Sequence, residues 1–175
     1  MRWLTDTSRL KQQNNGLWLT LDNQLFKDEN GDIILAPRKT ITDCFTIPAI
    51  FVPIVGNKLQ WDVRCSIQHD FECKFAQIIK VNLPEEKLYK QGYLKLHKNM
   101  IICENIPVEH LEIKDVSFNE ANDRFKRMLT ASGSIPKIKI NLMRFAVNFN
   151  TNWHSVKTPI NLNNIYEMVG RINGN

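Results

Sequence analysis

Short alternating stretches of apolar and polar residues fill the first third of the chain and predict β-strands. Residues 17–21 and 24–26 have the pattern of short strands, and Asp28-Glu29-Asn30-Gly31-Asp32 separates the second of them from the apolar residues 33–35. Because Asn-Gly accepts the positive φ of a tight turn, this spacing predicts a hairpin. We therefore expect a small antiparallel sheet at the N-terminal end of the fold.

From residue 59 onward the apolar positions repeat at helical spacing and predict two amphipathic helices. The first runs over residues 59 to about 80, and one side of it carries Leu59, Val63, Ile67, Phe71, Phe75 and Ile78. The second runs over residues 118 to about 131, where Asn119 is placed to cap the start and Ser132-Gly133-Ser134 ends the helix.

Two further helices are predicted near the C-terminal end, and one segment interrupts the series. The residues after Pro136 are apolar on nearly every side, which predicts a helix buried in the middle of the domain. An amphipathic helix follows Pro159. Residues 81–116 alternate only in part, and we interpret them as an inserted hairpin or lobe between the first two helices.

These elements predict an α+β fold. It has a small N-terminal antiparallel sheet, then a packed set of three to four helices, with the inserted hairpin or lobe between the first two. The sequence holds no internal repeat and no Gly- or Ser-rich linker, so we expect residues 1–175 to form a single domain.

Composition and charge narrow the class of protein. Hydrophobic residues make up 43% of the 175 positions and charged residues 23%, which excludes a wholly disordered chain. The net charge of +5 is spread among 18 acidic residues with no run of five basic ones, so we do not expect a nucleic-acid partner. The longest apolar stretches are broken by Pro and fall well short of the about 20 residues that a membrane span needs, which argues against an integral membrane protein.

The cysteines and the first residues bear on location. Cys44, Cys65, Cys73 and Cys103 form no C-x-x-C pair, and the chain begins without the apolar core of a signal peptide. We therefore expect reduced thiols in a cytoplasmic setting. A zinc site from Cys65, His69 and Cys73 is disfavoured, because ligands spread over two turns of one helix span about 12 Å.

The main chemical signal is a histidine and several carboxylates on the two amphipathic helices. His69 and Asp70 lie on the first, and Glu120 and Asp123 lie on the second. A carboxylate that accepts from one ring nitrogen fixes the tautomer and leaves the other nitrogen free to act as a base, while Asp70 could hold a cation. These four residues are the candidate catalytic group.

The structural alternative is a buried polar pair that locks the two helices together. An unpaired buried polar group costs about 1–3 kcal/mol, and such locking pairs are commoner than active sites, so the residue types alone favour the alternative. Asp43, Thr46 and Pro48 present a similar choice, between a rigid turn and a pocket in which Asp43 faces His69. Both choices stay open at this point.

Five short motifs follow one another in an order that resembles a known family. They are Ala36-Pro37-Arg38-Lys39, Thr42-Asp43-Cys44-Phe45-Thr46-Ile47-Pro48, His69-Asp70-Phe71-Glu72-Cys73, Glu120-Ala121-Asn122-Asp123-Arg124-Phe125 and Phe145-Ala146-Val147-Asn148-Phe149. In this order they resemble the bacteriophage and prophage proteins known as domain of unknown function 1353. The resemblance covers residues 17–149, with 81–116 as an insertion and 150–175 as an extension. Cys73 stands where that family usually has Tyr, and Asn122 where it usually has Asp.

The resemblance implies a phage origin and leaves two functions open. The first is an accessory component of the virion, in the tail or baseplate, that binds other phage structural proteins and is found in the virion or the host cytoplasm. The inserted lobe would then supply an interface of Leu94, Leu96, Met100 and Ile101.

The alternative is a small hydrolase of lipids or esters. The His-Asp helix with a downstream Asp is similar to the arrangement in calcium-dependent secreted phospholipases, where the histidine is the base and its neighbour binds calcium. Ca²⁺ is the one cofactor that this analogy implies, with Asp70 as its ligand. The chain has neither the Gly-rich calcium loop nor the disulfide pattern of that group.

Overall fold

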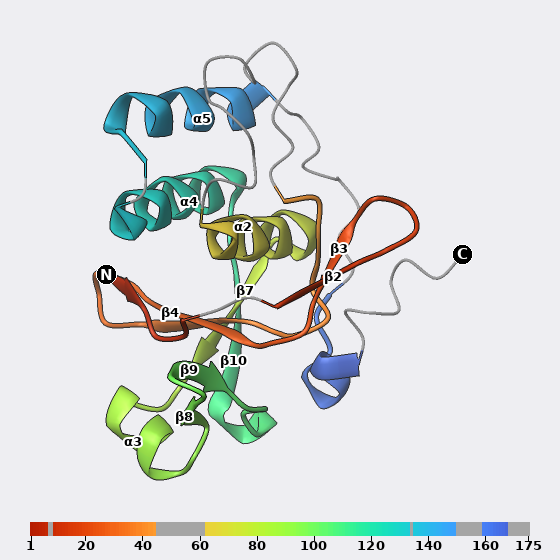
Figure 1. Ribbon diagram of the computed structural model, residues 1–175, viewed down its shortest axis with the longest axis vertical. Helices are drawn as coiled ribbons and strands as arrows, with labels where there is room; N and C mark the ends of the chain where they lie inside the picture. The colour runs from red at the N-terminus through yellow and green to blue at the C-terminus, as the bar shows by residue number, and fades with distance from the viewer. Residues whose placement is uncertain (7–8, 45–61, 134, 150–158, 168–175) are drawn as a thin grey trace.

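Strands precede the main helices along the chain, and the fold is mixed α+β, as the sequence predicts. The computed structural model describes residues 1–6, 9–44, 62–133, 135–149 and 159–167. Figure 1 shows three helices stacked in layers beside a twisted sheet, with a small hairpin at the opposite end of the molecule.

The main sheet has five antiparallel strands drawn from both halves of the chain. They are β1 (Arg2–Trp3), β4 (Gln24–Lys27), β5 (Ile33–Ala36), β7 (Gln77–Val81) and β10 (Leu111–Asp115), and they lie side by side in that order. The sheet is therefore not purely N-terminal, because two of its strands follow the first long helix.

The predicted hairpin joins β4 to β5. The side chain of Asp28 accepts hydrogen bonds from the backbone N–H groups of Asn30 and Asp32, each at 2.9 Å. Gly31 has a φ of 84°, which an L side chain rarely adopts. The turn residues thus form the connection that their spacing predicts.

Two smaller antiparallel sheets accompany the main one. The first joins β2 (Leu10–Gln12), β3 (Trp18–Thr20) and β6 (Ile41–Thr42), so the predicted strand over 17–21 belongs to a different sheet from β4. The second is the hairpin of β8 (Leu94–His97) and β9 (Met100–Cys103).

The first long helix, α2 (Val63–Phe75), is shorter at both ends than the apolar spacing predicts. Leu59 lies outside the described residues. At the other end the helix stops at Phe75, because Ala76 adopts a left-handed conformation with φ 50° and its N–H bonds to the carbonyl of Glu72. Residues 77–81 then form strand β7, which corrects the expectation of a helix to residue 80.

The helix in the middle of the fold is α2, and not the one after Pro136. Helix α2 contacts both α4 (Phe118–Ser132) and strand β7. Helix α5 (Lys137–Phe149) packs against α4 on the outside of the stack (Figure 1). Its Ile138 is 72% exposed, so the expectation of burial on all sides is wrong.

The start of α4 is capped by Ser117, and not by Asn119. The Ser117 side chain accepts from the N–H of Glu120, and the Glu120 carboxylate accepts from the N–H of Ser117. This reciprocal pair satisfies two backbone donors at once. Asn119 is exposed, and Gly133 ends the helix in the left-handed conformation.

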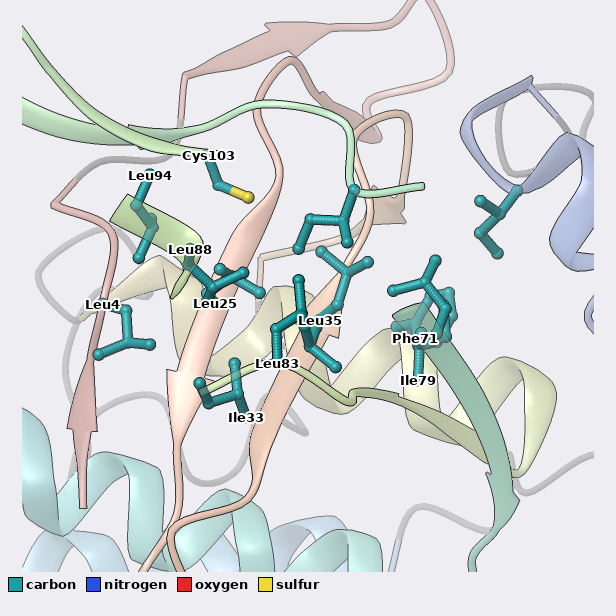
Figure 2. Close-up of a cluster of buried hydrophobic side chains, with 14 of the residues drawn as sticks. Leu4, Leu25, Ile33, Leu35, Phe71, Ile79, Leu83, Leu88, Leu94 and Cys103 are labelled. Carbon is teal, nitrogen blue, oxygen red and sulfur yellow. The ribbon is translucent and has the colours of Figure 1, made fainter. Parts of the chain in front are cut away.

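Residues 81–116, expected to be an inserted hairpin or lobe, do hold a hairpin, and they also supply part of the main sheet and core. They contain α3 (Glu85–Lys90), the β8–β9 hairpin, η3 (Val108–His110) and β10, which completes the main sheet. Their apolar side chains Leu83, Leu88 and Leu94 lie in the same core cluster as Leu25 and Leu35 (Figure 2).

The segment after Pro159 packs on this core. It begins with η4 (Leu162–Asn164), whose neighbours Ile160 and Ile165 are buried in the same cluster. The hydroxyl of Tyr166 donates to the carbonyl of Ile106 and accepts from its N–H. Val169 and Ile172, which the sequence places on the last helix, lie outside the described residues.

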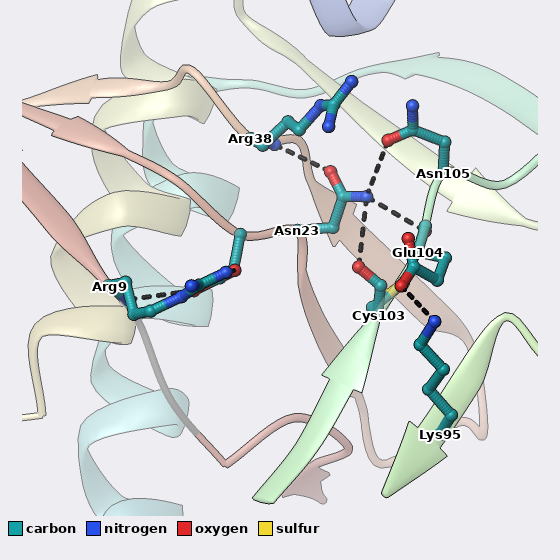
Figure 3. Close-up of polar contacts among 8 residues, drawn as sticks. Arg9, Asn23, Arg38, Lys95, Cys103, Glu104 and Asn105 are labelled. Carbon is teal, nitrogen blue, oxygen red and sulfur yellow. Dashed lines mark hydrogen bonds and ion pairs between the residues drawn. The ribbon is translucent and has the colours of Figure 1, made fainter. Parts of the chain in front are cut away.

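Asn23 fastens the hairpin to the sheets. Its amide nitrogen donates to the carbonyl of Glu104 at 2.9 Å and to Asn105 Oδ1 at 3.2 Å, and its oxygen accepts from the N–H of Arg38 at 2.8 Å (Figure 3). The side chain is 2% exposed. One buried amide therefore bonds to two segments far apart in the sequence.

We expect Asn23→Ala to lower the free energy of unfolding by about 2–4 kcal/mol, because several buried groups lose their partner. Asn23→Asp should be at least as harmful, since a carboxylate cannot donate to the carbonyl of Glu104. Urea denaturation measures both. The exposed Asn119→Ala is the matched control, and equal losses for Asn23→Ala and Asn119→Ala would contradict this account.

Candidate functional site

Three segments that are far apart in the sequence meet beside α2, and most of the residues that they contribute are buried. Thr42 comes from β6, His69 and Asp70 from α2, and Asn122 from α4. Thr42 Oγ1 bonds to Asp70 Oδ2 at 2.5 Å, and His69 Nε2 bonds to Asn122 Oδ1 at 2.8 Å. We call Thr42, His69, Asp70, Cys73 and Asn122 the α2 polar cluster.

His69 is buried between the two helices. It is 8% exposed, and its ring lies 4.6 Å, centroid to centroid, from that of Phe125. Because the amide oxygen of Asn122 accepts, Nε2 carries the proton in neutral His69 and Nδ1 holds the lone pair. Nδ1 lies 4.0 Å from Asp70 Oδ1 and 3.8 Å from Cys73 Sγ.

This surrounding keeps His69 neutral. Burial lowers the pKa of His69 to about 4, although the bond to Asn122 opposes the shift. An amide oxygen orients the ring as a carboxylate would, but it carries no full charge to stabilise an imidazolium. At pH 7 His69 is therefore oriented like a catalytic base but is a weak one.

The pKa of Asp70 is shifted in the opposite direction, upward. Its side chain is 25% exposed, and desolvation together with the nearby Asp43 raises its pKa, while bonds from Thr42 and from the Asp43 backbone lower it. Two neighbouring carboxyl groups resist losing both protons, since like charges repel. The site thus combines a neutral histidine with a carboxyl group that holds its proton more tightly than usual.

The two acids expected beside His69 are engaged elsewhere. Asp123 pairs with Arg144 of α5 at 2.5 Å, and Glu120 completes the capping box. Asn122 occupies the expected position instead. It shares the inward face of α4 with Ala121 and Phe125, and this helical spacing is the signal that could have selected it over Asp123.

The segment 42–48 is described only in part. The hydroxyl of Thr42 accepts from the N–H of Cys44 at 3.0 Å, and Cys44 has a φ of 54°, so the residues form a tight turn. The turn brings Asp43 next to Asp70 and not into a bond with His69. Thr46 and Pro48 lie outside the described residues.

Sequence reasoning missed a second polar group on the buried side of α2. Glu72 is fully buried, bonds to Gln68 at 2.8 Å and pairs with Arg124 of α4 at 2.6 Å. Burial raises the pKa of Glu72 to about 7, and Arg124 opposes that shift. A helix with Gln68 and Glu72 four residues apart carries no signal that this side faces inward.

Metal ligands do not gather at the cluster. Within the described ranges, no three His, Cys, Asp or Glu side chains are placed to hold one ion. Cys65 packs in a separate apolar cluster with Phe26, away from Cys73. Asp43 and Asp70 lie close enough for their charges to interact, so a cation near one would also interact with the other.

The four residues expected to form an interface, Leu94, Leu96, Met100 and Ile101, differ in how far they are exposed. Leu94 is 2% exposed and belongs to the core, which corrects its assignment, whereas Leu96 is 71% exposed. Met100 and Ile101 are half-buried. Ile101 is also bound by its backbone to Asp6, at 3.0 Å and 2.7 Å.

Comparison with known proteins identifies no relative. No family model, no curated protein and no solved structure matches the chain. Among the helices that the structure describes, none combines the length and apolar character that crossing a membrane requires.

The depressed pKa of His69 predicts how stability varies with pH. The unfolded chain takes up a proton near the ordinary pKa of about 6.5, whereas folded His69 does so near 4, so acidification favours unfolding over this interval. From pH 7.5 to 5 the wild type should lose about 2 kcal/mol more than His69→Gln. Urea denaturation of both proteins at pH 7.5 and at pH 5 measures this difference in the free energy of unfolding.

The exposed Asn119→Ala is the control for that experiment and should follow the wild-type dependence of stability on pH, because it changes no titratable group. If the free energy of unfolding changed equally with pH in the wild type and in His69→Gln, that result would contradict the buried neutral state of His69.

Proposed function

We propose that this protein is an accessory component of a bacteriophage particle, in the tail or baseplate, that acts through contacts with other phage proteins. One observation supports the family resemblance behind this proposal. The bonds Thr42–Asp70 and His69–Asn122 join three of the motif segments in space. Motifs that share one tertiary site are better markers of a common fold than isolated short matches.

The chemistry of the cluster favours a binding protein over an enzyme. His69 is buried with a pKa near 4, and its oriented nitrogen faces an amide rather than a carboxylate. A general base works best with a pKa near the working pH, so this histidine is poorly matched to catalysis at neutral pH. Its bonds instead hold α2 against α4.

The contact surface that we propose for phage partners is the outer part of the β8–β9 hairpin. Leu96 is 71% exposed there, and Tyr89 of the adjacent α3 is 42% exposed. Exposed apolar side chains on an ordered hairpin are typical of binding sites. The hairpin is held in place by Asn23 and Asp6, so it would present Leu96 in a fixed position.

Mass spectrometry of purified particles tests this proposal. Particles of the phage that carries the gene should contain the protein in a fixed ratio to the tail proteins. Particles assembled with Leu96→Asp should lose it, whereas Ile138→Asp, the same kind of change at an equally exposed apolar residue on α5, should not. Absence of the wild-type protein from purified particles would remove the proposal.

A small hydrolase of lipids or esters is the second candidate, and one feature of the geometry around His69 supports it. The Nδ1 lone pair lies on the side of Asp70, whose raised pKa keeps a proton available. A neutral base next to a protonated carboxyl group is an arrangement that acid-base catalysis uses. If Ca²⁺ binds here, it would be held by Asp70 and Asp43 as carboxylates, and Asp70 would then no longer supply the proton.

A hydrolysis screen on short-chain esters and phospholipid vesicles, with and without Ca²⁺, tests this second function. If the chain is a hydrolase, His69→Ala and Asp70→Asn should each reduce turnover by roughly a hundredfold or more, as expected for the loss of a general base or its partner. Asp123→Asn should have no effect, because Asp123 bonds to Arg144. A wild-type chain without turnover under all conditions would eliminate the hydrolase.

A further inference from the structure

Strand β10 forms one edge of the main sheet, and no described strand pairs with its outer side. The N–H of Asn82 bonds to the carbonyl of His110 at 2.8 Å, and the N–H of Val116 bonds to the carbonyl of Ala76 at 2.9 Å. Backbone groups alternate in direction along an antiparallel strand, so those of Ile113 point away from β7. No described residue pairs with the outward groups of Ile113.

The side chains of this edge carry both signs of charge. Glu112 and Lys114 lie on the same face of the strand, are 45% and 46% exposed, and pair with each other at 3.7 Å. Ile113 lies between them on the opposite face, where it packs against the core and sits opposite Ile79 of β7. The order acid, apolar, base is complementary to itself when two such strands run antiparallel.

We infer that two copies of this chain associate through their β10 strands, antiparallel and centred on Ile113. In this register Glu112 of each copy stands opposite Lys114 of the other. These are non-hydrogen-bonded positions, where facing side chains come closest. The same alignment therefore places Ile113 opposite Ile113 and gives Glu112 and Lys114 an oppositely charged neighbour in the other copy, in addition to their pairing within the chain.

The backbone supports the same register. The N–H and carbonyl of Ile113 in one copy pair with the carbonyl and N–H of Ile113 in the other. The N–H of Asp115 donates to the carbonyl of Leu111, whose own N–H is already bonded to Val108. The twofold axis uses the same edge of both copies, so the association closes at a dimer.

A purely protective role for the charges is the competing explanation, because edge strands often carry Lys to prevent pairing. Preventing strand pairing requires only a charge at the edge. This strand instead carries opposite charges, Glu112 and Lys114, one on each side of its central residue Ile113. A five-residue edge buries little area, so we expect a dissociation constant in roughly the micromolar range.

Sedimentation analysis of the full chain over a range of concentrations tests the dimer. The wild type should change reversibly from monomer to dimer. Lys114→Glu places two acids opposite each other across the axis, and Glu112→Lys places two bases there. Each change should weaken the dimer roughly tenfold or more. Lys114→Glu also removes the pairing with Glu112 within the chain, but its neighbour in the β7 register is the apolar Ile78, whereas Glu112 stands opposite Lys80.

Mixing the two variants gives the sharpest result. One copy with two acids and one with two bases are complementary again, so an equimolar mixture should form a heterodimer with nearly wild-type affinity. Lys137→Glu, the same change at an exposed position on α5, should leave the wild-type dimer unaltered. Thermal unfolding of each variant checks that the fold is retained.

Three outcomes would overturn the inference. If the wild type stays monomeric at about 1 mM, two copies do not pair through β10, and its edge would instead be a site for a strand of another protein. A dimer that neither variant weakens would use another surface. Two variants that weaken the dimer but fail to associate on mixing would show that the charges do not face each other.

Discussion

The fold depends on burying a helix that is only half apolar. Helix α2 lies between the sheets and α4, and its buried residues include Ser66, Gln68, His69 and Glu72. Each of these needs a partner, because an unpaired buried polar group costs about 1–3 kcal/mol and an unpaired charge costs more. The partners come from α2 itself and from α4, which fixes the position of α4 along α2.

This constraint explains the layered arrangement. Arg124 neutralises Glu72 and Asn122 accepts from His69, so one face of α4 is committed to α2. The outer side of α4 is left for α5, where Arg144 pairs with Asp123. The buried contacts are specific and hydrogen-bonded, whereas the outer pair is nearly half exposed and is expected to contribute little.

The sequence predicted the class of fold better than the limits of its elements. The β4–β5 turn and α4 follow from local signals, namely Asn-Gly before an apolar strand and a regular apolar stripe. The end of α2 has no such signal, because Ala76 takes the left-handed conformation that Gly usually supplies. The apolar residues Ile78 and Ile79 fit a helix or a strand equally well until the pairing with β5 and β10 decides.

The sequence predicted the candidate site only in part. His69 and Asp70 could be selected from their types, but the partner of His69 could not, because a step of one residue turns a helix by about 100°. Asn122 and Asp123 therefore face different neighbours, and the more reactive residue is the one turned away. The network of Glu72 and Arg124 depends on which side of α2 is buried, and that is settled by packing between distant segments.

The pairing of β5 with β7 also sets the order in which the sheet can be completed. Residues 33–36 pair with β4 soon after they are synthesised, but their other edge waits for residues 77–81, after the whole of α2. During that interval the edge of β5 that will later face β7 has no strand partner. All four residues of β5, Ile33, Ile34, Leu35 and Ala36, are buried in the finished fold. Such edges are sites of intermolecular strand pairing. While the stretch between the two strands is being synthesised, this open edge is therefore available for pairing with another chain.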